Sequence, residues 1–374
     1  MTALATRARL ATPAPTLEID LVAIADNTRR FVRVAHGEVM AVVKADGFGH
    51  GLADVARTAV ANGATWLGVT SIAEGLAVRA AGVDAPVLSW LNPLDAEVAS
   101  AVRHRIDLAV PSVAHLAAIT AAAPRRRVRV HLQLDTGMAR DGAAPDEWLE
   151  LMTASRRAEA AGHVTVVGVM GHLAMASEPG NPANTHGRRA LLCGVEMARQ
   201  AGLAPSVRHL AATAATLTDP GTHLDLVRIG AGLVGIDPSD STRLRPALRL
   251  TAPVVQVRRV GAGVGVGYGH THVTDRPTGL ALLPLGYADG LPRAASGHAE
   301  VLVDGVRGPV VGVISMDQTV VDIGDHPVEP GATAVVFGPG DDGEPTVEEW
   351  AAWAGTIPHE IVTGIGHRVG RSVR

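Results

Sequence analysis

Short apolar runs alternate with longer segments of helical spacing between about residues 37 and 232. Several of the eight apolar runs are valine-rich and continuous, which is typical of parallel strands buried on both faces. Four of the helical segments are followed by a glycine at a C-cap position. The runs are Met40–Lys44, Thr65–Thr70, Ala85–Trp90, Ile106–Val110, Val128–Asp135, Val164–His172, Ser206–Thr213 and Leu224–Gly230. The helical segments are Leu52–Asn62, Ala73–Ala81, Pro93–Arg105, Val113–Ala123, Pro145–Ala161 and Ala183–Ala201.

Eight strand–helix units of this size predict a (β/α)8 TIM barrel. An open, doubly wound sheet is the alternative, but no GxGxxG turn follows the first run. After about residue 246 the pattern changes to β-type runs separated by Gly, Pro and Asp turns, with Val347–Ala354 as the one helical segment. The β-type runs are Leu248–Val260, Thr278–Leu285, Glu300–Val303, Gly308–Ile314, Gln318–Ile323 and Thr333–Phe337.

The chain is longer than one hydrophobic core usually supports, so two domains are expected in its 374 residues. We predict a disordered arm at residues 1–16, a barrel domain at 17–245 and a smaller, mainly-β domain at 246–374. The segment Leu17–Leu21 precedes the first helix, Val22–Val34, and could pair with the second domain as an extra strand.

Composition favours a globular enzyme, with 47% hydrophobic and 19% charged residues. The net charge of -4 offers no basic excess for nucleic-acid backbones, so nucleic acid is not expected as a partner. Cys193 is the only cysteine, which excludes a disulfide within the chain and favours a reducing compartment. Residues 1–16 contain no continuous apolar run, and no apolar stretch is long enough for a membrane span. We therefore expect a cytoplasmic protein without a membrane partner.

Lysine and tyrosine are rare in this chain. Lys44 is the single lysine among 33 Lys and Arg residues. An amine can lose its proton and attack a carbonyl, whereas guanidinium stays protonated, so a lone lysine is a candidate nucleophile. The alternative is a lysine that survived compositional drift by chance. The two tyrosines, Tyr268 and Tyr287, are possible proton carriers or core residues.

Chemically capable side chains fall at the ends of the predicted barrel strands. Active sites of such barrels lie at the strand C-termini, with a phosphate site after strands seven and eight. On this face of the barrel, the lysine at the end of the first strand could bind an aldehyde. The Thr-Ala-Ala and Gly-Ala-Gly turns after strands seven and eight could bind a phosphate. This combination indicates a site for pyridoxal 5'-phosphate (PLP). The residues at these ends are Lys44, Arg140, His172, His209, Thr213, Arg228 and Gly230.

Nine segments, in order over almost the whole chain, resemble the motifs of the alanine racemase family, the fold-type III PLP enzymes. A coincidental match of nine ordered motifs is very improbable. They are AVVKADGFGHG (41–51), HLQLDTGMARDG (131–142), MGHLA (170–174), RHLAATAAT (208–216), LDLVRIGAGLVGIDP (224–238), VGYGHT (266–271), PLGYADGLPR (284–293), GVISMDQ (312–318) and HEIVTGIGHRVGR (359–371).

The resemblance implies catalytic roles for four residues and an orienting, cofactor-site role for His209. Lys44 should hold PLP covalently and act as one base, and Tyr268 should reach the opposite face of the substrate from the partner subunit. His172 should lie beside that tyrosine, although alone it would more often be a buried core histidine. Arg228 should face the pyridine nitrogen, oriented by His209. The alternative for Arg228 is an ordinary salt-bridged arginine.

The resemblance also implies a set of binding residues. Thr213, Gly230 and Ala231 should bind the phosphate through a hydroxyl and backbone N–H groups. Four further residues should contribute to substrate binding. Arg140 and the Met316 N–H should bind the carboxylate, and Tyr287 of the partner subunit should line the entrance. Asp317 should position Arg140 or the entrance, and its alternative is an aspartate that only stabilises a turn. A site shared in this way implies a homodimer.

Five positions depart from the family pattern. Phe48 and His359 stand where the family has tyrosines that reach the phosphate, and Ala212 replaces an asparagine. Val234 replaces another tyrosine, and Gln133 occupies the place of a lysine that becomes carbamylated. We expect PLP binding to be retained with a changed phosphate site, in which His359 could replace one lost hydrogen bond. Gln133 bears on the affinity for the substrate carboxylate.

The expected activity is an isomerase reaction, the racemisation of alanine, which would supply D-alanine as a peptidoglycan precursor. One alternative is the racemisation of another small amino acid such as serine in secondary metabolism. Two others are a catalytically weak PLP-binding homologue and PLP-dependent decarboxylation or aldol chemistry on the same barrel.

Overall fold

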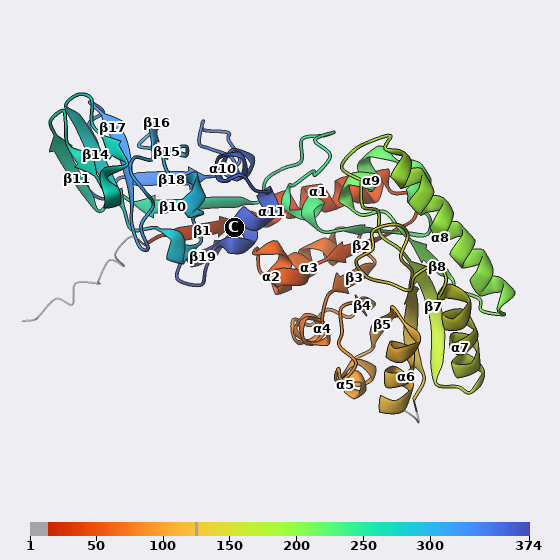
Figure 1. Cartoon of the computed structure of the whole chain (residues 1–374). Coiled ribbons are helices and arrows are strands. Elements are labelled where there is room, and N and C mark those ends of the chain that lie inside the picture. The colour runs from red at the N-terminus through yellow and green to blue at the C-terminus, as the bar shows by residue number, and fades with distance from the viewer. Residues whose placement is uncertain (1–13, 124–125) are drawn as a thin grey trace, which may run out of the picture. The chain divides into compact units, whose positions relative to one another are not determined.

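The computed structural model describes residues 14–123 and 126–374, which form two compact units (Figure 1). One unit is Leu21–Ala247. The other is Leu248–Arg374 together with the N-terminal segment that ends at Asp20. Among the described residues, no helix is both long and apolar enough to cross a membrane.

The unit Leu21–Ala247 is built on an eight-stranded parallel sheet in the order β8-β7-β6-β5-β4-β3-β2-β9. Backbone N–H groups of Asp225 and Arg228 donate to the carbonyls of Arg208 (3.1 Å) and Ala211 (3.0 Å), which joins the two ends of this order. The predicted barrel is therefore confirmed. The strands are β2 (Glu38–Val42), β3 (Trp66–Val69), β4 (Val87–Ser89), β5 (Ile106–Val110), β6 (Val128–Gln133), β7 (Val164–Met170), β8 (Val207–His209) and β9 (Leu226–Ile229).

Helices cover the outside of the barrel, as α7 and α8 do beside β7 (Figure 1). The predicted helix Pro93–Arg105 is too long, because the chain from Pro93 first makes a turn and α5 begins only at Val98. The helices are α1 (Leu21–Val34), α2 (Lys44–Phe48), α3 (Leu52–Ala61), α4 (Ile72–Ala80), α5 (Val98–Arg103), α6 (Val113–Ala122), α7 (Trp148–Ala160), α8 (Pro182–Gln200) and α9 (Thr213–Thr218).

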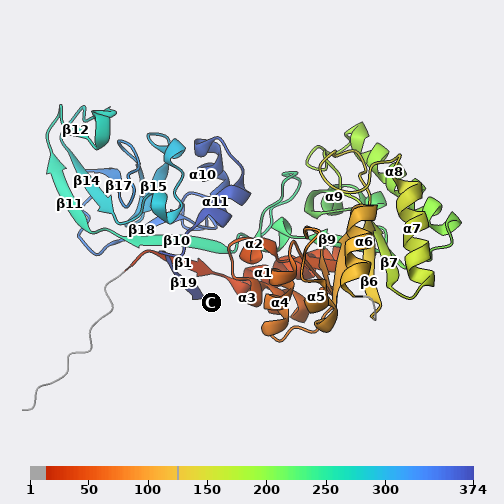
Figure 2. The ribbon, with the colours of Figure 1, turned by 60° about the horizontal axis from the view of Figure 1, so that its bottom comes forward.

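The other unit is mainly β (Figure 2). A six-stranded sheet has the order β16-β15-β18-β10-β1-β19, and β11-β14-β17 and β12-β13 form two smaller sheets. The strands are β1 (Thr16–Ile19), β10 (Leu248–Pro253), β11 (Gln256–Val260), β12 (Gly265–Val266), β13 (His272–Val273), β14 (Thr278–Leu283), β15 (Glu300–Val303), β16 (Val306–Pro309), β17 (Thr319–Gly324), β18 (Thr333–Phe337) and β19 (Gly370–Val373).

The N-terminal strand β1 pairs antiparallel with β10 and parallel with β19. Thr16 belongs to this strand and not to a disordered arm, and residues 1–13 of the predicted arm lie outside the described part of the chain. The helix predicted at Val347–Ala354 is α10, but the prediction missed a second helix, α11 (Pro358–Gly364), which begins with a proline. The predicted run Gly308–Ile314 is wrong, because β16 ends at Pro309.

Candidate active site

Lys44 lies two residues past the end of β2, not at the end of the strand as predicted, and it begins the short segment α2. The residues Ala45 to Phe48 all have φ between 52° and 62°, so the backbone makes a left-handed turn directly after the lysine. Left-handed helical backbone costs a non-glycine residue roughly 1–2 kcal/mol. Neighbouring groups must therefore hold this turn in place.

The amine of Lys44 is half-buried at the barrel mouth. Burial lowers its pKa, the nearby guanidinium of Arg140 lowers it further, and the carboxylate of Glu74 opposes both effects. The net pKa lies below the usual value of a lysine. A larger fraction of the amine is then neutral and nucleophilic near pH 7.

Arg228 extends from β9 and is buried among four hydrogen-bond acceptors. Its Nη2 lies 2.7 Å from Gly171 O, 3.1 Å from Leu210 O and 3.0 Å from His172 Nδ1, and its Nη1 lies 3.3 Å from His209 Nδ1. Burial lowers the pKa of Arg228 to about 10. Because guanidinium only donates, both histidines accept on Nδ1 and carry their proton on Nε2.

A chain of buried polar groups continues from His209 into the barrel. His209 Nε2 lies 2.9 Å from His131 Nδ1, and His131 Nε2 lies 3.5 Å from a carboxylate oxygen of Asp107. Arg129 pairs with the same carboxylate at 2.9 Å. His131 and Asp107 were not predicted from the sequence, although a polar residue inside an apolar strand run was the available signal.

His172 follows β7 at the same end of the barrel, two residues beyond the strand that was predicted to include it. Burial, and then the positive charges of Arg228, Arg140 and Lys44, lower its pKa to about 3. The imidazole is therefore neutral at physiological pH. With Nδ1 occupied by Arg228, its Nε2–H is the group that remains to donate.

The ends of β8 and β9 form the predicted phosphate region. Thr213 begins α9, and Gly230 precedes the 3-10 helix η2 (Ala231–Val234). The N–H of Gly232 donates to Thr213 Oγ1 at 3.1 Å, so the hydroxyl hydrogen remains available to another acceptor. A Cβ at Gly230 would lie 2.6 Å from Phe48 Cζ, so the phenyl ring occupies the space beside this turn.

Ala212 and Val234 are the other two residues in this region that differ from the family pattern. Ala212 is the N-cap residue of α9, and its methyl group makes no capping hydrogen bond. An asparagine there would supply the cap, which is typically worth about 0.5–2 kcal/mol. Val234 is buried at the end of η2.

The loop after β6 carries Arg140, which is exposed. The carboxylate of Asp135 accepts hydrogen bonds from three successive backbone N–H groups, residues 137–139, and so shapes this loop. Gln133 ends β6 and is only 8% exposed, and its Oε1 has no hydrogen-bond partner among the described residues.

The other candidate residues lie in the mainly-β unit. Tyr268 begins the 3-10 helix η3 (Tyr268–His270) between β12 and β13 and is 76% exposed. The backbone N–H of Tyr287 donates to the carbonyl of Ser315, which brings Tyr287 next to Met316. Both Tyr287 and Met316 are exposed.

Asp317 and His359 are the last two candidate residues in the mainly-β unit. Asp317 forms an ion pair with Arg368 at 2.7 Å, and Arg368 also pairs with Asp289 at 3.2 Å. Arg368 was not among the residues predicted from the sequence. His359 is half-buried in α11.

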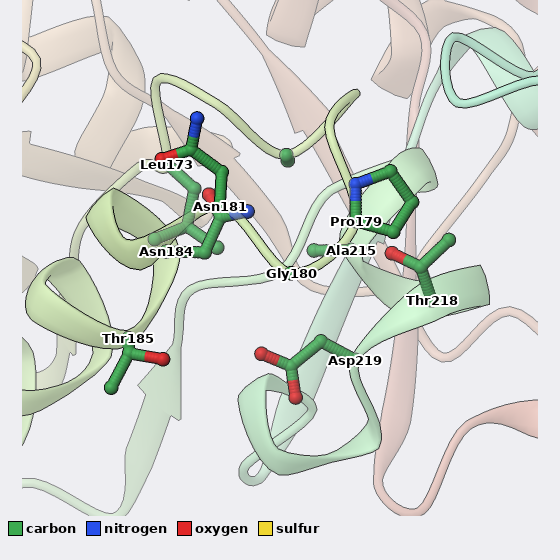
Figure 3. A pocket seen from close by; sticks show the side chains of 10 residues that line it. Leu173, Pro179, Gly180, Asn181, Asn184, Thr185, Ala215, Thr218 and Asp219 are labelled. Atoms are coloured by element: carbon green, nitrogen blue, oxygen red, sulfur yellow. The ribbon is translucent and has the colours of Figure 1, made fainter.

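A cavity of about 210 Å³ lies between the segment after β7, the start of α8 and helix α9 (Figure 3). None of the predicted site residues lines it. Its lining residues are Leu173, Ala176, Pro179, Gly180, Asn181, Asn184, Thr185, Ala215, Thr218 and Asp219.

Together the barrel and the cluster at its strand ends are typical of a (β/α)8-barrel enzyme. The family model for the alanine racemase N-terminal domain matches residues 19–238, and the model for the C-terminal domain matches residues 247–373. The chain belongs to the alanine racemase family.

Relatives and solved structures agree with this assignment. The chain is 50% identical to the alanine racemase of Thermobifida fusca over 359 residues, which is 94% of this chain and 96% of that protein. The crystal structure of alanine racemase from D-cycloserine producing Streptomyces lavendulae matches with a TM-score of 0.95 and 42% identity, covering 97% of this chain and 98% of that one. The alanine racemase of Bartonella henselae, solved with covalently bound pyridoxal phosphate, matches with a TM-score of 0.88 and 26% identity, covering 97% of this chain and 100% of that one.

Proposed function

We propose that this chain interconverts L- and D-alanine, with PLP bound through Lys44. The observation that carries the proposal is the buried guanidinium of Arg228, held by two carbonyls and two neutral histidines on the barrel face that also presents the only lysine. PLP supplies the electron sink that makes the α-proton of an amino acid removable.

The residues at the strand ends fit this cofactor. The lowered pKa of Lys44 suits an amine that bonds to an aldehyde carbon. The free hydroxyl hydrogen of Thr213 and the backbone at Gly230 and Ala231 suit a phosphate. Phe48 adds no hydrogen bond there, and we assign its ring to packing against Gly230.

Arg228 would lie against the pyridine nitrogen and keep it unprotonated, because a guanidinium gives up its proton far less readily than a carboxylic acid. Arg228 would thereby weaken the electron sink that the cofactor supplies, compared with an aspartic acid at the same place. That effect would favour return of a proton to the α-carbon over transamination.

Racemisation needs one group to remove the α-proton and another to return a proton from the opposite face. We assign Lys44 to one face and Tyr268 of the partner subunit to the other. Neutral His172, fixed by Arg228, has an Nε2–H directed away from the guanidinium. That N–H could donate to the phenol oxygen and stabilise its ionised form.

We assign the substrate carboxylate to Arg140 and the N–H of Met316, with Tyr287 of the partner subunit at the entrance. The buried amide of Gln133 carries no charge, so Arg140 has less electrostatic support than a carbamylated lysine would give it. The proposed enzyme is a homodimer, because Tyr268 serves the neighbouring cofactor.

Proton exchange in D2O tests the function. The wild-type protein should exchange the α-proton of L-alanine by NMR and yield D-alanine on chiral chromatography, with L-serine as the competing substrate. Lys44→Ala and Tyr268→Phe should each lose roughly a hundred-fold or more in rate. Lys44→Arg keeps the positive charge and should be as inactive as Lys44→Ala. Exchange of serine but not alanine would assign a different substrate, and full activity in Lys44→Arg would rule out the amine.

A further inference from the structure

Glu74 connects two neighbouring loops at the barrel mouth. It is the third residue of α4, and its Oε2 accepts hydrogen bonds from the N–H and hydroxyl of Thr70, both at 2.8 Å, and from the N–H of Ser71 at 3.3 Å. Its Oε1 accepts the N–H of Ala45 at 2.8 Å, and Ala45 is the residue that follows Lys44. One carboxylate therefore ties the loop after β3 to the lysine loop after β2.

The bond to Ala45 is not required by the helix. A capping box needs only the reciprocal bonds between Ser71 and Glu74, and both are present. Oε1 instead accepts the N–H of Ala45, the first residue of the left-handed turn. Ala45 and Asp46 both have a positive φ although neither is a glycine, so this backbone needs external support. Asp46 accepts the N–H of Leu52 at 2.8 Å at the far side of the turn, so carboxylates from two sources hold a strained backbone.

The charge of the same carboxylate raises the pKa of the Lys44 amine. Burial raises the pKa of Glu74, but the hydrogen bonds from Ala45, Thr70 and Ser71 outweigh burial and leave the pKa below its usual value. Glu74 is thus ionised at neutral pH. The positive charge of Arg140 has the opposite effect and lowers the pKa of Lys44.

We propose that Glu74 is a positioning residue for Lys44, because its Oε1 fixes the left-handed turn that presents the lysine. This inference rests on the proposed role of Lys44, but its test does not require the racemase reaction.

The single lysine makes the test direct, because lysine labelled with 13C at Cε gives one NMR signal from the whole chain. The titration is followed on the full-length protein freed of cofactor. In Glu74→Gln the pKa of Lys44 should fall by about half a unit or more. The matched control is Ser71→Ala, which removes the other half of the capping box and leaves the bond to Ala45. It should leave the pKa of Lys44 unchanged.

Amide hydrogen exchange tests the positioning directly. The N–H of Ala45 should exchange about ten-fold faster or more in Glu74→Ala, and at the wild-type rate in Ser71→Ala. The proposal is overturned if neither the Lys44 pKa nor the Ala45 exchange rate responds to the Glu74 variants. It is also overturned if Ser71→Ala changes them equally, because the effect would then come from the stability of α4. If both measurements are as expected but the wild-type protein does not racemise alanine, the proposed function is wrong and the role of Glu74 stands.

Discussion

At the scale of single residues, Arg228 determines the protonation pattern of its neighbours. Because it can only donate, His209 and His172 must present Nδ1 as an acceptor, and the same logic carries from His209 to His131. The hydrogen bonds then run from Arg228 to His209 and from His209 to His131, whose Nε2 lies 3.5 Å from the Asp107 carboxylate without a hydrogen bond to it. A buried positive charge is thereby stabilised from inside the barrel without a carboxylate touching it.

His50 allows a pH prediction at this scale. It is completely buried, and burial lowers its pKa to about 4 although the carbonyl of Phe48 accepts its Nδ1–H. Between about pH 6.5 and pH 4 the unfolded chain binds a proton that the folded protein does not. The contribution of His50 to stability is therefore full above about pH 6.5 and is lost as the pH falls through that window.

Unfolding in urea measures this loss. From about pH 6.5 to pH 5, His50 should cost the wild-type protein about 2 kcal/mol of unfolding free energy. His50→Gln cannot titrate and should show a shallower pH dependence by about that amount, while the buried histidines common to both proteins cancel. Identical slopes in the two proteins would mean that folding does not lower the pKa of His50.

At the scale of elements, the residue before η2, Gly230, lies close to Phe48 in the loop that follows Lys44. Gly230 has an ordinary negative φ of −117°, so its lack of a side chain matters for space and not for backbone freedom. A Cβ there would lie 2.6 Å from Phe48 Cζ and 3.4 Å from Val42 Cβ. The glycine lets the turn at Gly230 approach the left-handed turn that follows Lys44.

Gly230→Ala should therefore push these turns apart. Overpacking of this kind typically costs about 1–3 kcal/mol, and we expect PLP affinity to fall by roughly ten-fold or more. Fluorescence titration with PLP measures the affinity. In the double variant Gly230→Ala with Phe48→Leu, the smaller side chain should restore most of the loss. An equally weak double variant would show that the ring is not the obstacle.

The sequence predicted which helices and strands exist more accurately than the residues at which they begin and end. The valine-rich barrel strands were recognisable because burial on both faces demands apolar runs, but Lys44 and His172 lie beyond the strands that were extended to include them. No local preference of Ala45 or Asp46 reveals a left-handed turn, since tertiary hydrogen bonds hold it. Glu74 was not among the residues predicted from the sequence, because its bond to Ala45 depends on the packing of two loops.

At the scale of the whole molecule, the candidate residues are divided between two units. Lys44, His172 and Arg228 belong to the barrel, whereas the exposed Tyr268 belongs to the mainly-β unit. If Tyr268 completes the site of a second copy, each active site contains Lys44 from one chain and Tyr268 from the other. Dimerisation is then part of catalysis and not only of stability.

Mixing two inactive variants decides this question. Lys44→Ala and Tyr268→Phe homodimers should each be inactive. After co-expression, about half of the dimers are mixed, and each mixed dimer contains one site with both wild-type residues and one with neither. The mixture should therefore recover about a quarter of the wild-type rate of alanine racemisation. If Tyr268 served the lysine of its own chain, no mixed dimer would contain a complete site. The mixture would then stay inactive although size-exclusion chromatography and mass spectrometry showed mixed dimers.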